Sequence, residues 1–211
     1  MVVIFTDNPR SRAREISREH SIPIEILDIK EFFKKHPRLK RYNLKDRPEY
    51  DREVVKLLKP YKIDLLAYAG FMNITTKPII ESFLGINVHP ADLSIKDSQG
   101  KRKFVGEQAV KDAIKAGEKT IGSTTHLITT GVDQGPILMI SKRLKVKVPK
   151  GLSLKKDPNK IADFNQERLK EAGDWIIFPK SIELIAKGEI TQNQKNRLFF
   201  QEKEIPDGIR L

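Results

Sequence analysis

Short apolar runs alternate with amphipathic segments along most of this 211-residue chain. The residues in the apolar runs are largely β-branched, and most runs are followed by a proline, glycine or Asp/Asn/Thr that can cap a helix. The predicted strands are residues 2–6, 22–27, 63–69 and 85–90, and the predicted helices are residues 9–19, 29–35, 48–59, 76–83 and 106–116. This alternation predicts the α/β class: a doubly wound, mostly parallel sheet with helices on both faces.

The later part of the chain departs from strict alternation. Residues 120–129 and 136–148 are both strand-like, which favours an antiparallel pair. Residues 159–187 have a helical pattern with expected interruptions near Gly173 and Pro179. The length suits one compact domain with an appendage, so we expect a domain over residues 1–190 and a C-terminal extension, residues 191–211, packed on it.

Composition excludes several classes of site and location. The chain has no cysteine, which removes disulfides, thiolate zinc sites and a cysteine nucleophile. It has only 4 histidines, so we predict no metal site. No apolar stretch approaches the roughly 20 residues needed to cross a bilayer, and the first residues lack a signal-peptide pattern. A soluble, cytoplasmic protein without a membrane partner is expected.

The net charge of +12 leaves two interpretations open. Residues 34–47 contain seven cations and one acid, and residues 142–160 contain eight cations and one acid. Such runs are typical of solvated surfaces, but they also suit phosphate or nucleic acid. Aromatic residues make up only 7% of the chain and no nucleic-acid motif is present, so a nucleic-acid partner is disfavoured without being ruled out.

Polar residues at predicted strand ends suggest a catalytic group. Asn87 and His89 are two residues apart on a strand and project from the same face. Histidine can move a proton near neutral pH, and an asparagine amide can donate to an oxygen that gains charge. A carboxylate that favours the protonated imidazole completes such a group, and Asp133, flanked by Gly131 and Gly135, is the candidate.

Four segments in this order resemble a known family. They are Ala-Gly-Phe-Met at residues 69–72, Ile-Asn-Val-His-Pro at 86–90, Ser-Thr-Thr-His at 123–126 and Val-Asp-Gln-Gly-Pro-Ile-Leu at 132–138. Together they resemble the signatures of the 10-formyltetrahydrofolate-dependent formyltransferases. This resemblance implies a Rossmann-like fold. The phosphoribosylglycinamide formyltransferase branch, which serves one-carbon metabolism and purine biosynthesis, is the most similar. The resemblance extends from residue 2 to about residue 190.

The resemblance implies a role for each matching residue. Asn87 and His89 would polarise the formyl oxygen of 10-formyltetrahydrofolate, and Asp133 would assist proton movement as an amine attacks. His126 would support Asp133 from a neighbouring strand, although a purely structural role is an equal alternative. Asp174 lies near the position of an acid that contacts the acceptor amine in the family, so the resemblance implies that Asp174 binds the acceptor. The residues expected to form the folate pocket are Gly70, Phe71, Met72, Asn73, Ile74, Thr130 and Val132.

Departures from the family pattern leave the acceptor open. The family's first strand and phosphate-binding loop would precede residues 2–6 and are not in this sequence. We therefore expect side-chain cations such as Lys101 and Arg102 to bind an acceptor phosphate. Asn73 stands where the family often has arginine. The acceptor could be glycinamide ribonucleotide or another amine, and two alternatives remain: hydrolysis of formyltetrahydrofolate, or a non-catalytic, basic RNA-binding module.

Overall fold

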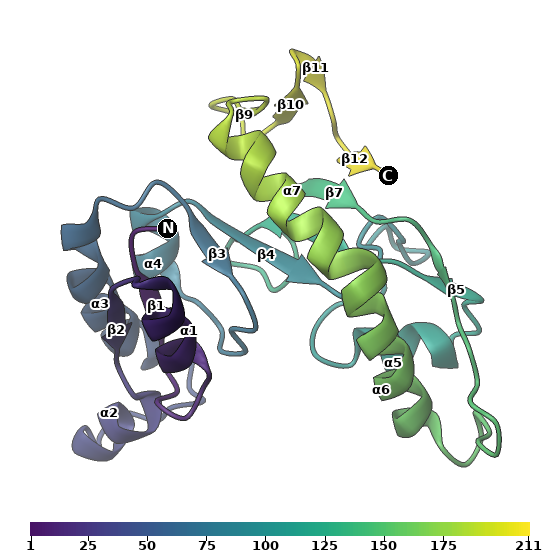
Figure 1. Ribbon diagram of the computed structural model, residues 1–211, viewed down its shortest axis with the longest axis horizontal. Helices are drawn as coiled ribbons and strands as arrows, with labels where there is room; N and C mark the ends of the chain where they lie inside the picture. The colour runs from purple at the N-terminus through teal and green to yellow at the C-terminus, as the bar shows by residue number, and fades with distance from the viewer. The chain divides into compact units, whose positions relative to one another are not determined.

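The computed structural model describes all 211 residues, which form two compact units. Unit 1 comprises Met1–Leu66 and Met72–Leu84, and unit 2 comprises Ala67–Phe71 and Gly85–Leu211 (Figure 1). Each unit has its own buried apolar cluster. None of the helices is long and apolar enough to span a membrane.

Unit 1 combines a small parallel sheet with helices. Strand β1 (Ile4–Thr6) pairs in parallel with β2 (Ile24–Ile26). The remaining elements are α1 (Ala13–His20), α2 (Ile29–Lys35), α3 (Arg47–Leu58), the 3₁₀ turn η1 (Lys59–Tyr61) and α4 (Lys77–Ser82). Asp28 begins α2 by accepting hydrogen bonds from the backbone N–H groups of Lys30 and Glu31, the usual role of an aspartate cap.

A buried carboxylate joins two helices of unit 1. Asp51 on α3 is fully buried and forms an ion pair with Arg47, one turn earlier, at 3.1 Å. Both the backbone N–H and the hydroxyl of Thr76, the residue that precedes α4, donate to Asp51 at 2.7 Å. The hydroxyl of Thr76 therefore holds α3 and makes no capping hydrogen bond to its own helix.

The main sheet of unit 2 has the strand order β12-β7-β6-β4-β3. Its strands are β3 (Leu66–Tyr68), β4 (Gly85–His89), β6 (Thr124–Leu127), β7 (Ile137–Ile140) and β12 (Ile209–Arg210). β4 is antiparallel to β6, β6 is antiparallel to β7, and β12 is parallel to β7. The first residue of β3 belongs to unit 1.

The α/β class is therefore confirmed, but the main sheet is mixed rather than mostly parallel, because β6 is antiparallel to both β4 and β7. The chain between β6 and β7 contains no helix, which suits an antiparallel connection rather than a parallel crossover. Helix α5 (Ala109–Lys115), which lies between β4 and β6 in sequence, packs against α6 (Pro158–Leu169). The antiparallel pairing expected for the two later runs is confirmed by β6 with β7 and by β5 (Thr120–Ile121) with β8 (Leu144–Lys145).

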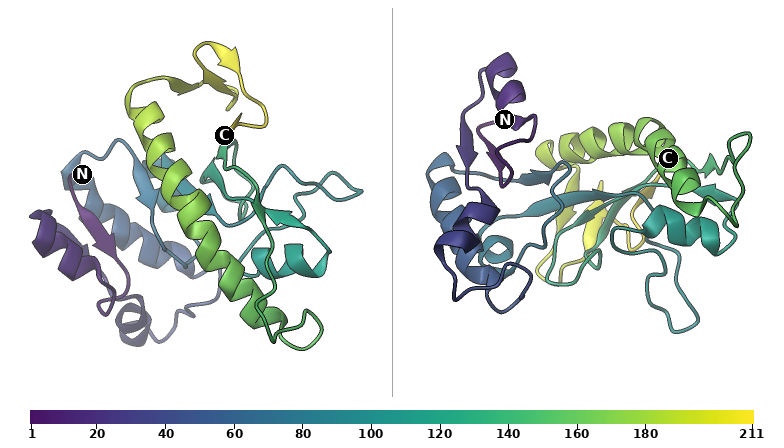
Figure 2. Two further views of the ribbon diagram at one scale, coloured as in Figure 1. Left: turned by 45° about the vertical axis from the view of Figure 1, so that its right-hand side comes forward. Right: turned by 90° about the horizontal axis from the view of Figure 1, so that it is seen from below.

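The long helical segment of unit 2 lies along the main sheet, as the two views of Figure 2 show. It consists of α6, a π-helical turn η2 (Lys170–Asp174) and α7 (Trp175–Ala186), and α7 packs on β6 and β7. The interruption expected near Gly173 is this π-helical turn. Pro179 lies inside α7, and the helix continues past it to Ala186, so the interruption expected there is not seen.

The C-terminal residues add further strands to unit 2. β9 (Ile190–Gln192), β10 (Leu198–Phe200) and β11 (Lys203–Glu204) form an antiparallel sheet of three strands. After them the chain returns to the main sheet as β12. Gly208, which precedes β12, has a positive φ of 72°, and a Cβ there would lie 2.9 Å from the Ile137 carbonyl oxygen.

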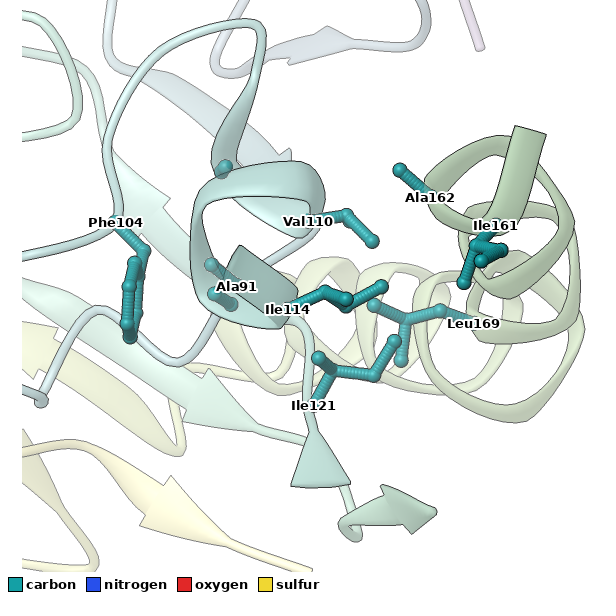
Figure 3. Close-up of a cluster of buried hydrophobic side chains, with 10 residues drawn as sticks. Ala91, Phe104, Val110, Ile114, Ile121, Ile161, Ala162 and Leu169 are labelled. Carbon is teal, nitrogen blue, oxygen red and sulfur yellow. The ribbon is translucent and has the colours of Figure 1, made fainter. Parts of the chain in front are cut away.

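A buried apolar cluster in unit 2 supports the loops around His89. Figure 3 shows that Val110 and Ile114 of α5 point toward Ile161 and Leu169 of α6. The same cluster includes residues on either side of the strand end: Ala91, Phe104 and Ile121. Apolar burial in this cluster therefore fixes the backbone that surrounds the end of β4.

We expect the Leu169→Ala variant to be destabilised by about 2–5 kcal/mol, because Leu169 is fully buried and its truncation leaves a cavity. Urea unfolding followed by circular dichroism measures this loss. Leu154→Ala, at a side chain that is 50% exposed, is the matched control and should stay within about 0.5 kcal/mol. Equal losses in the two variants would contradict the assignment of the cluster as the core of unit 2.

Candidate functional site

The end of β4 brings two predicted site residues next to β6. Asn87 and His126 are paired across the two antiparallel strands. The Asn87 amide nitrogen Nδ2 lies 3.5 Å from Nε2 of His126. His89, the last residue of β4, is buried, as is His126, whereas Asn87 is half-buried. The sheet thus presents one amide and two imidazoles at neighbouring positions.

The loop between β6 and β7 places Asp133 between the two imidazoles. Its Oδ2 lies 3.4 Å from Nδ1 of His89, and its Oδ1 lies 3.5 Å from Nε2 of His126. The backbone N–H of Gly106 donates to Oδ2 at 2.7 Å. The Asp133 side chain is 9% exposed, so water does little to screen these contacts.

The sharp turn that carries Asp133 depends on its backbone. Asp133 has a φ of 53°, in the left-handed region that aspartate tolerates better than most residues. A Cβ on Gly135 would lie 1.7 Å from the carbonyl oxygen of Leu127, so no other residue fits there. The glycine after the aspartate, which the sequence marked as a turn residue, is thus required for the loop to approach β6.

Backbone carbonyls determine which imidazole nitrogens carry hydrogen. Nε2 of His89 lies 2.9 Å from the Phe104 carbonyl oxygen, and Nδ1 of His126 lies 2.9 Å from the Leu127 carbonyl oxygen. A carbonyl only accepts, so each of these nitrogens carries the N–H. The other ring nitrogen of each histidine faces Asp133 and carries no hydrogen in the neutral imidazole. It can donate to the carboxylate only when the imidazole takes up a second proton.

Burial and charge set the pKa values of this group. Burial lowers the pKa of His89 below its usual 6.5, although the charge of Asp133 and the Phe104 carbonyl both act in the opposite direction. Burial alone would raise the pKa of Asp133, but His126, the charge of His89 and the Gly106 N–H together lower it to about 2. Near neutral pH the carboxylate is ionised beside a neutral His89 imidazole that can accept a proton.

Four of the predicted folate-pocket residues belong to unit 2. Gly70 has a φ of 67°, and the ring of Phe71 contacts Tyr68 edge-on, with centroids 5.4 Å apart. Thr130 and Val132 are exposed and lie in the same loop as Asp133. Their exposure leaves both free to contact a ligand at this loop.

The other three predicted folate-pocket residues, Met72, Asn73 and Ile74, belong to unit 1. Met72 and Ile74 are exposed. The Asn73 amide donates to a carboxylate oxygen of Asp7, and its oxygen lies 3.5 Å from an Arg41 guanidinium nitrogen. Asn73 therefore joins two charged side chains within unit 1, at the position where the resembling family often has arginine.

The predicted acceptor-binding residues differ in their surroundings. Lys101 is exposed in a loop after β4, whereas Arg102 is half-buried and donates to the backbone carbonyls of Asp133 and Gly135. Asp174, at the end of η2, has a buried Oδ1 without a hydrogen-bond partner, and burial raises its pKa. Its place in a π-helical turn is notable, because such turns recur at functional sites.

Sequence reasoning missed three partners of the predicted catalytic group. These are the Phe104 carbonyl, the Gly106 N–H and the guanidinium of Arg102, which all lie within one loop between β4 and α5. Two are backbone groups, which leave no residue-type signal. The structure contains no group of three or more His, Asp or Glu side chains that could hold a metal ion.

Asp133→Asn tests the coupling between carboxylate and imidazole. The negative charge of Asp133 favours the protonated form of His89, so its removal should lower the His89 pKa further. NMR titration of the imidazole resonances measures the change. Asp163→Asn, at an exposed position of α6, removes the same charge as a control and should leave the titration unchanged. A His89 pKa that stays constant or rises in Asp133→Asn would contradict this geometry.

The sequence is similar to parts of known purine biosynthetic proteins. Trifunctional purine biosynthetic protein adenosine-3 from Drosophila melanogaster is 26% identical over 190 residues, which cover 89% of this chain and 12% of that protein. The human protein of the same name is 28% identical over 162 residues, covering 76% of this chain and 14% of that protein. The chain thus spans less than one sixth of these much longer relatives.

Solved structures share the fold. The phosphoribosylglycinamide formyltransferase of Coxiella burnetii has a TM-score of 0.71 at 19% identity, with 100% of this chain and 85% of that chain covered. A formyltetrahydrofolate deformylase from Pseudomonas putida has a TM-score of 0.59 at 16% identity, with 95% and 59% covered. The family model described as formyl transferase matches residues 1–172. Because that match covers most of the chain and includes the strand ends with Asn87, His89 and Asp133, the protein belongs to the formyl transferase family.

Proposed function

We propose that this protein transfers a formyl group from 10-formyltetrahydrofolate to an amine. The observation that carries the proposal is the Asp133 carboxylate between the buried imidazoles of His89 and His126, with the Asn87 amide alongside. The motifs that bring these residues together lie inside the segment that matches the formyl transferase family. The group combines a donor for a developing oxyanion with a means of moving protons.

The proposed reaction needs these two capabilities in sequence. The amine nitrogen attacks the formyl carbon, and the formyl oxygen takes up the electron pair of its double bond. The Asn87 amide has N–H groups to donate to that oxygen, and a His89 imidazolium held by Asp133 can stabilise the charge. The bond between the formyl carbon and the folate nitrogen then breaks. That nitrogen gains a proton, and the amine nitrogen loses one.

We propose glycinamide ribonucleotide as the first acceptor to test, which would place the protein in purine biosynthesis. Support comes from the phosphoribosylglycinamide formyltransferases that share the fold and from the purine biosynthetic relatives. Asp174 is the proposed contact for the acceptor amine, since its buried oxygen lacks a partner and can accept from an ammonium or amine N–H. Lys101 is the proposed contact for an acceptor phosphate.

Hydrolysis of formyltetrahydrofolate is the second candidate. A formyltetrahydrofolate deformylase is among the structures with this fold. In that reaction water replaces the amine as nucleophile, and the same oxyanion donor and proton carrier suffice. The two candidates differ in the product: a formylated amine in one case, and free formate in the other.

We expect His89→Ala to lower the turnover number by at least about a hundredfold, in line with the loss of an acid–base group. Binding of a reduced folate, measured by calorimetry, should persist, because the imidazole contacts the Phe104 carbonyl and Asp133 and not the predicted folate-pocket residues. His20→Ala, at an exposed histidine of unit 1, is the control and should retain full turnover. A near-normal turnover number in His89→Ala would remove this residue from the proposed mechanism.

The decisive experiment for the function separates the products. The protein is incubated with 10-formyltetrahydrofolate and a panel of amines that includes glycinamide ribonucleotide. Mass spectrometry then reports the gain of one formyl group, and an enzymatic assay reports free formate. Formylation of an amine supports the proposal, and formate release without it supports hydrolysis. Failure to bind folate, together with RNA binding that weakens steeply with salt, would favour a non-catalytic RNA-binding module.

A further inference from the structure

Arg102 contacts the loop of the catalytic carboxylate rather than open solvent. Its NH1 donates to the carbonyl oxygen of Asp133, and its NH2 donates to the carbonyl oxygen of Gly135 at 2.8 Å. The two nitrogens of one planar guanidinium thus bridge two carbonyls of the same sharp turn. Arg102 is half-buried, unlike its exposed neighbours Lys101 and Lys103.

Apart from Arg102, one charge-assisted hydrogen bond holds this turn, from the Gly106 N–H to the Asp133 carboxylate at 2.7 Å. Asp133 adopts a left-handed φ of 53°, a conformation that costs free energy for any residue with a Cβ. The other hydrogen bond across the turn runs from Gln134 N–H to the Gly131 carbonyl at 3.2 Å. Hydrogen bonds from a charged donor are about twice as strong as neutral ones, so the guanidinium is well suited to hold this conformation.

The same loop also contacts the imidazole and the carboxylate. Phe104 is anchored in the apolar cluster and offers its carbonyl to His89, and Gly106 donates to Asp133. One loop therefore fixes the Asp133 turn and the His89 ring relative to each other through three residues: Arg102, Phe104 and Gly106. Only Arg102 does so through its side chain, which makes it accessible to mutation.

We propose that Arg102 is a positioning residue that holds the Asp133 turn in register with His89. This differs from the expectation that Arg102 binds an acceptor phosphate, because two of its N–H groups are already engaged with backbone carbonyls. A lysine could not take its place: an ammonium is a point charge and lacks the rigid fork that reaches two carbonyls at once. The catalytic part of this inference rests on the proposed function.

Three variants separate geometry from charge. Arg102→Met removes both, Arg102→Lys keeps the charge, and Arg168→Met is the matched control. Arg168 also donates to a backbone carbonyl, that of Lys145, but its hydrogen bond is exposed and ties α6 to β8. Before the comparison, urea unfolding curves confirm that each of the three variants is folded under the assay conditions.

The first measurement does not depend on activity. Hydrogen exchange of the Gly106 amide, whose N–H donates to Asp133, is followed by NMR in the substrate-free protein. We expect exchange to accelerate at least about tenfold in both Arg102 variants, because the carboxylate loses its fixed position, and to stay unchanged in Arg168→Met. Unchanged exchange in Arg102→Met would overturn the inference, whether or not the protein transfers formyl groups.

The second measurement distinguishes positioning from substrate binding. A misplaced carboxylate should lower kcat on the order of tenfold to a hundredfold in both Arg102 variants with little change in KM. Loss of a phosphate contact would instead raise KM, preserve kcat and be rescued in part by lysine. That second pattern, with normal Gly106 exchange, would contradict the inference. Absence of formyl transfer in the unmodified protein would overturn the proposed function and leave the exchange result to decide the role of Arg102.

Discussion

The rest of the site depends on the interactions that stabilise the buried negative charge of Asp133. An ionised carboxylate is costly to bury unless donors and cations surround it. Here the Gly106 N–H and the guanidinium on the adjoining carbonyls supply that compensation, and an imidazole adds to it when it takes up a second proton. The same arrangement that makes the charge tolerable also keeps it available to a protonated His89, so the stability of the fold and the proposed proton transfer depend on one set of contacts.

The apolar cluster of unit 2 holds this charge indirectly. Phe104 and Ala91 belong to it, and they flank the loop and the strand end that carry the partners of Asp133. Close-packed side chains allow little backbone movement, so the carbonyl of Phe104 stays aimed at His89. Helices α5 and α6 thus contribute to the site without placing a side chain on the carboxylate.

The sequence predicts some of this arrangement and not the rest, for physical reasons. Two-residue spacing and a glycine-flanked turn indicated that Asn87, His89 and Asp133 could act together, and the structure places His89 and Asp133 3.4 Å apart, while their catalytic role stays a prediction. The antiparallel direction of β6 and β7 followed from two consecutive strand-like runs. The direction of β4 against β6 was not predictable, because buried strands look alike in parallel and antiparallel sheets. Arg102 lies in a lysine-rich loop whose composition is typical of a solvated surface. Backbone partners such as the Phe104 carbonyl are present in every residue type, so the sequence does not indicate them.

We propose that Asp133 and the two imidazoles form one proton-sharing group whose N–H directions are set by backbone carbonyls. Imidazole ¹⁵N chemical shifts at neutral pH, assigned through His89→Gln and His126→Gln, test this most directly. We predict hydrogen on Nε2 of His89 and on Nδ1 of His126, each toward its carbonyl. A neutral His89 with hydrogen on Nδ1, already donated to Asp133, would contradict it.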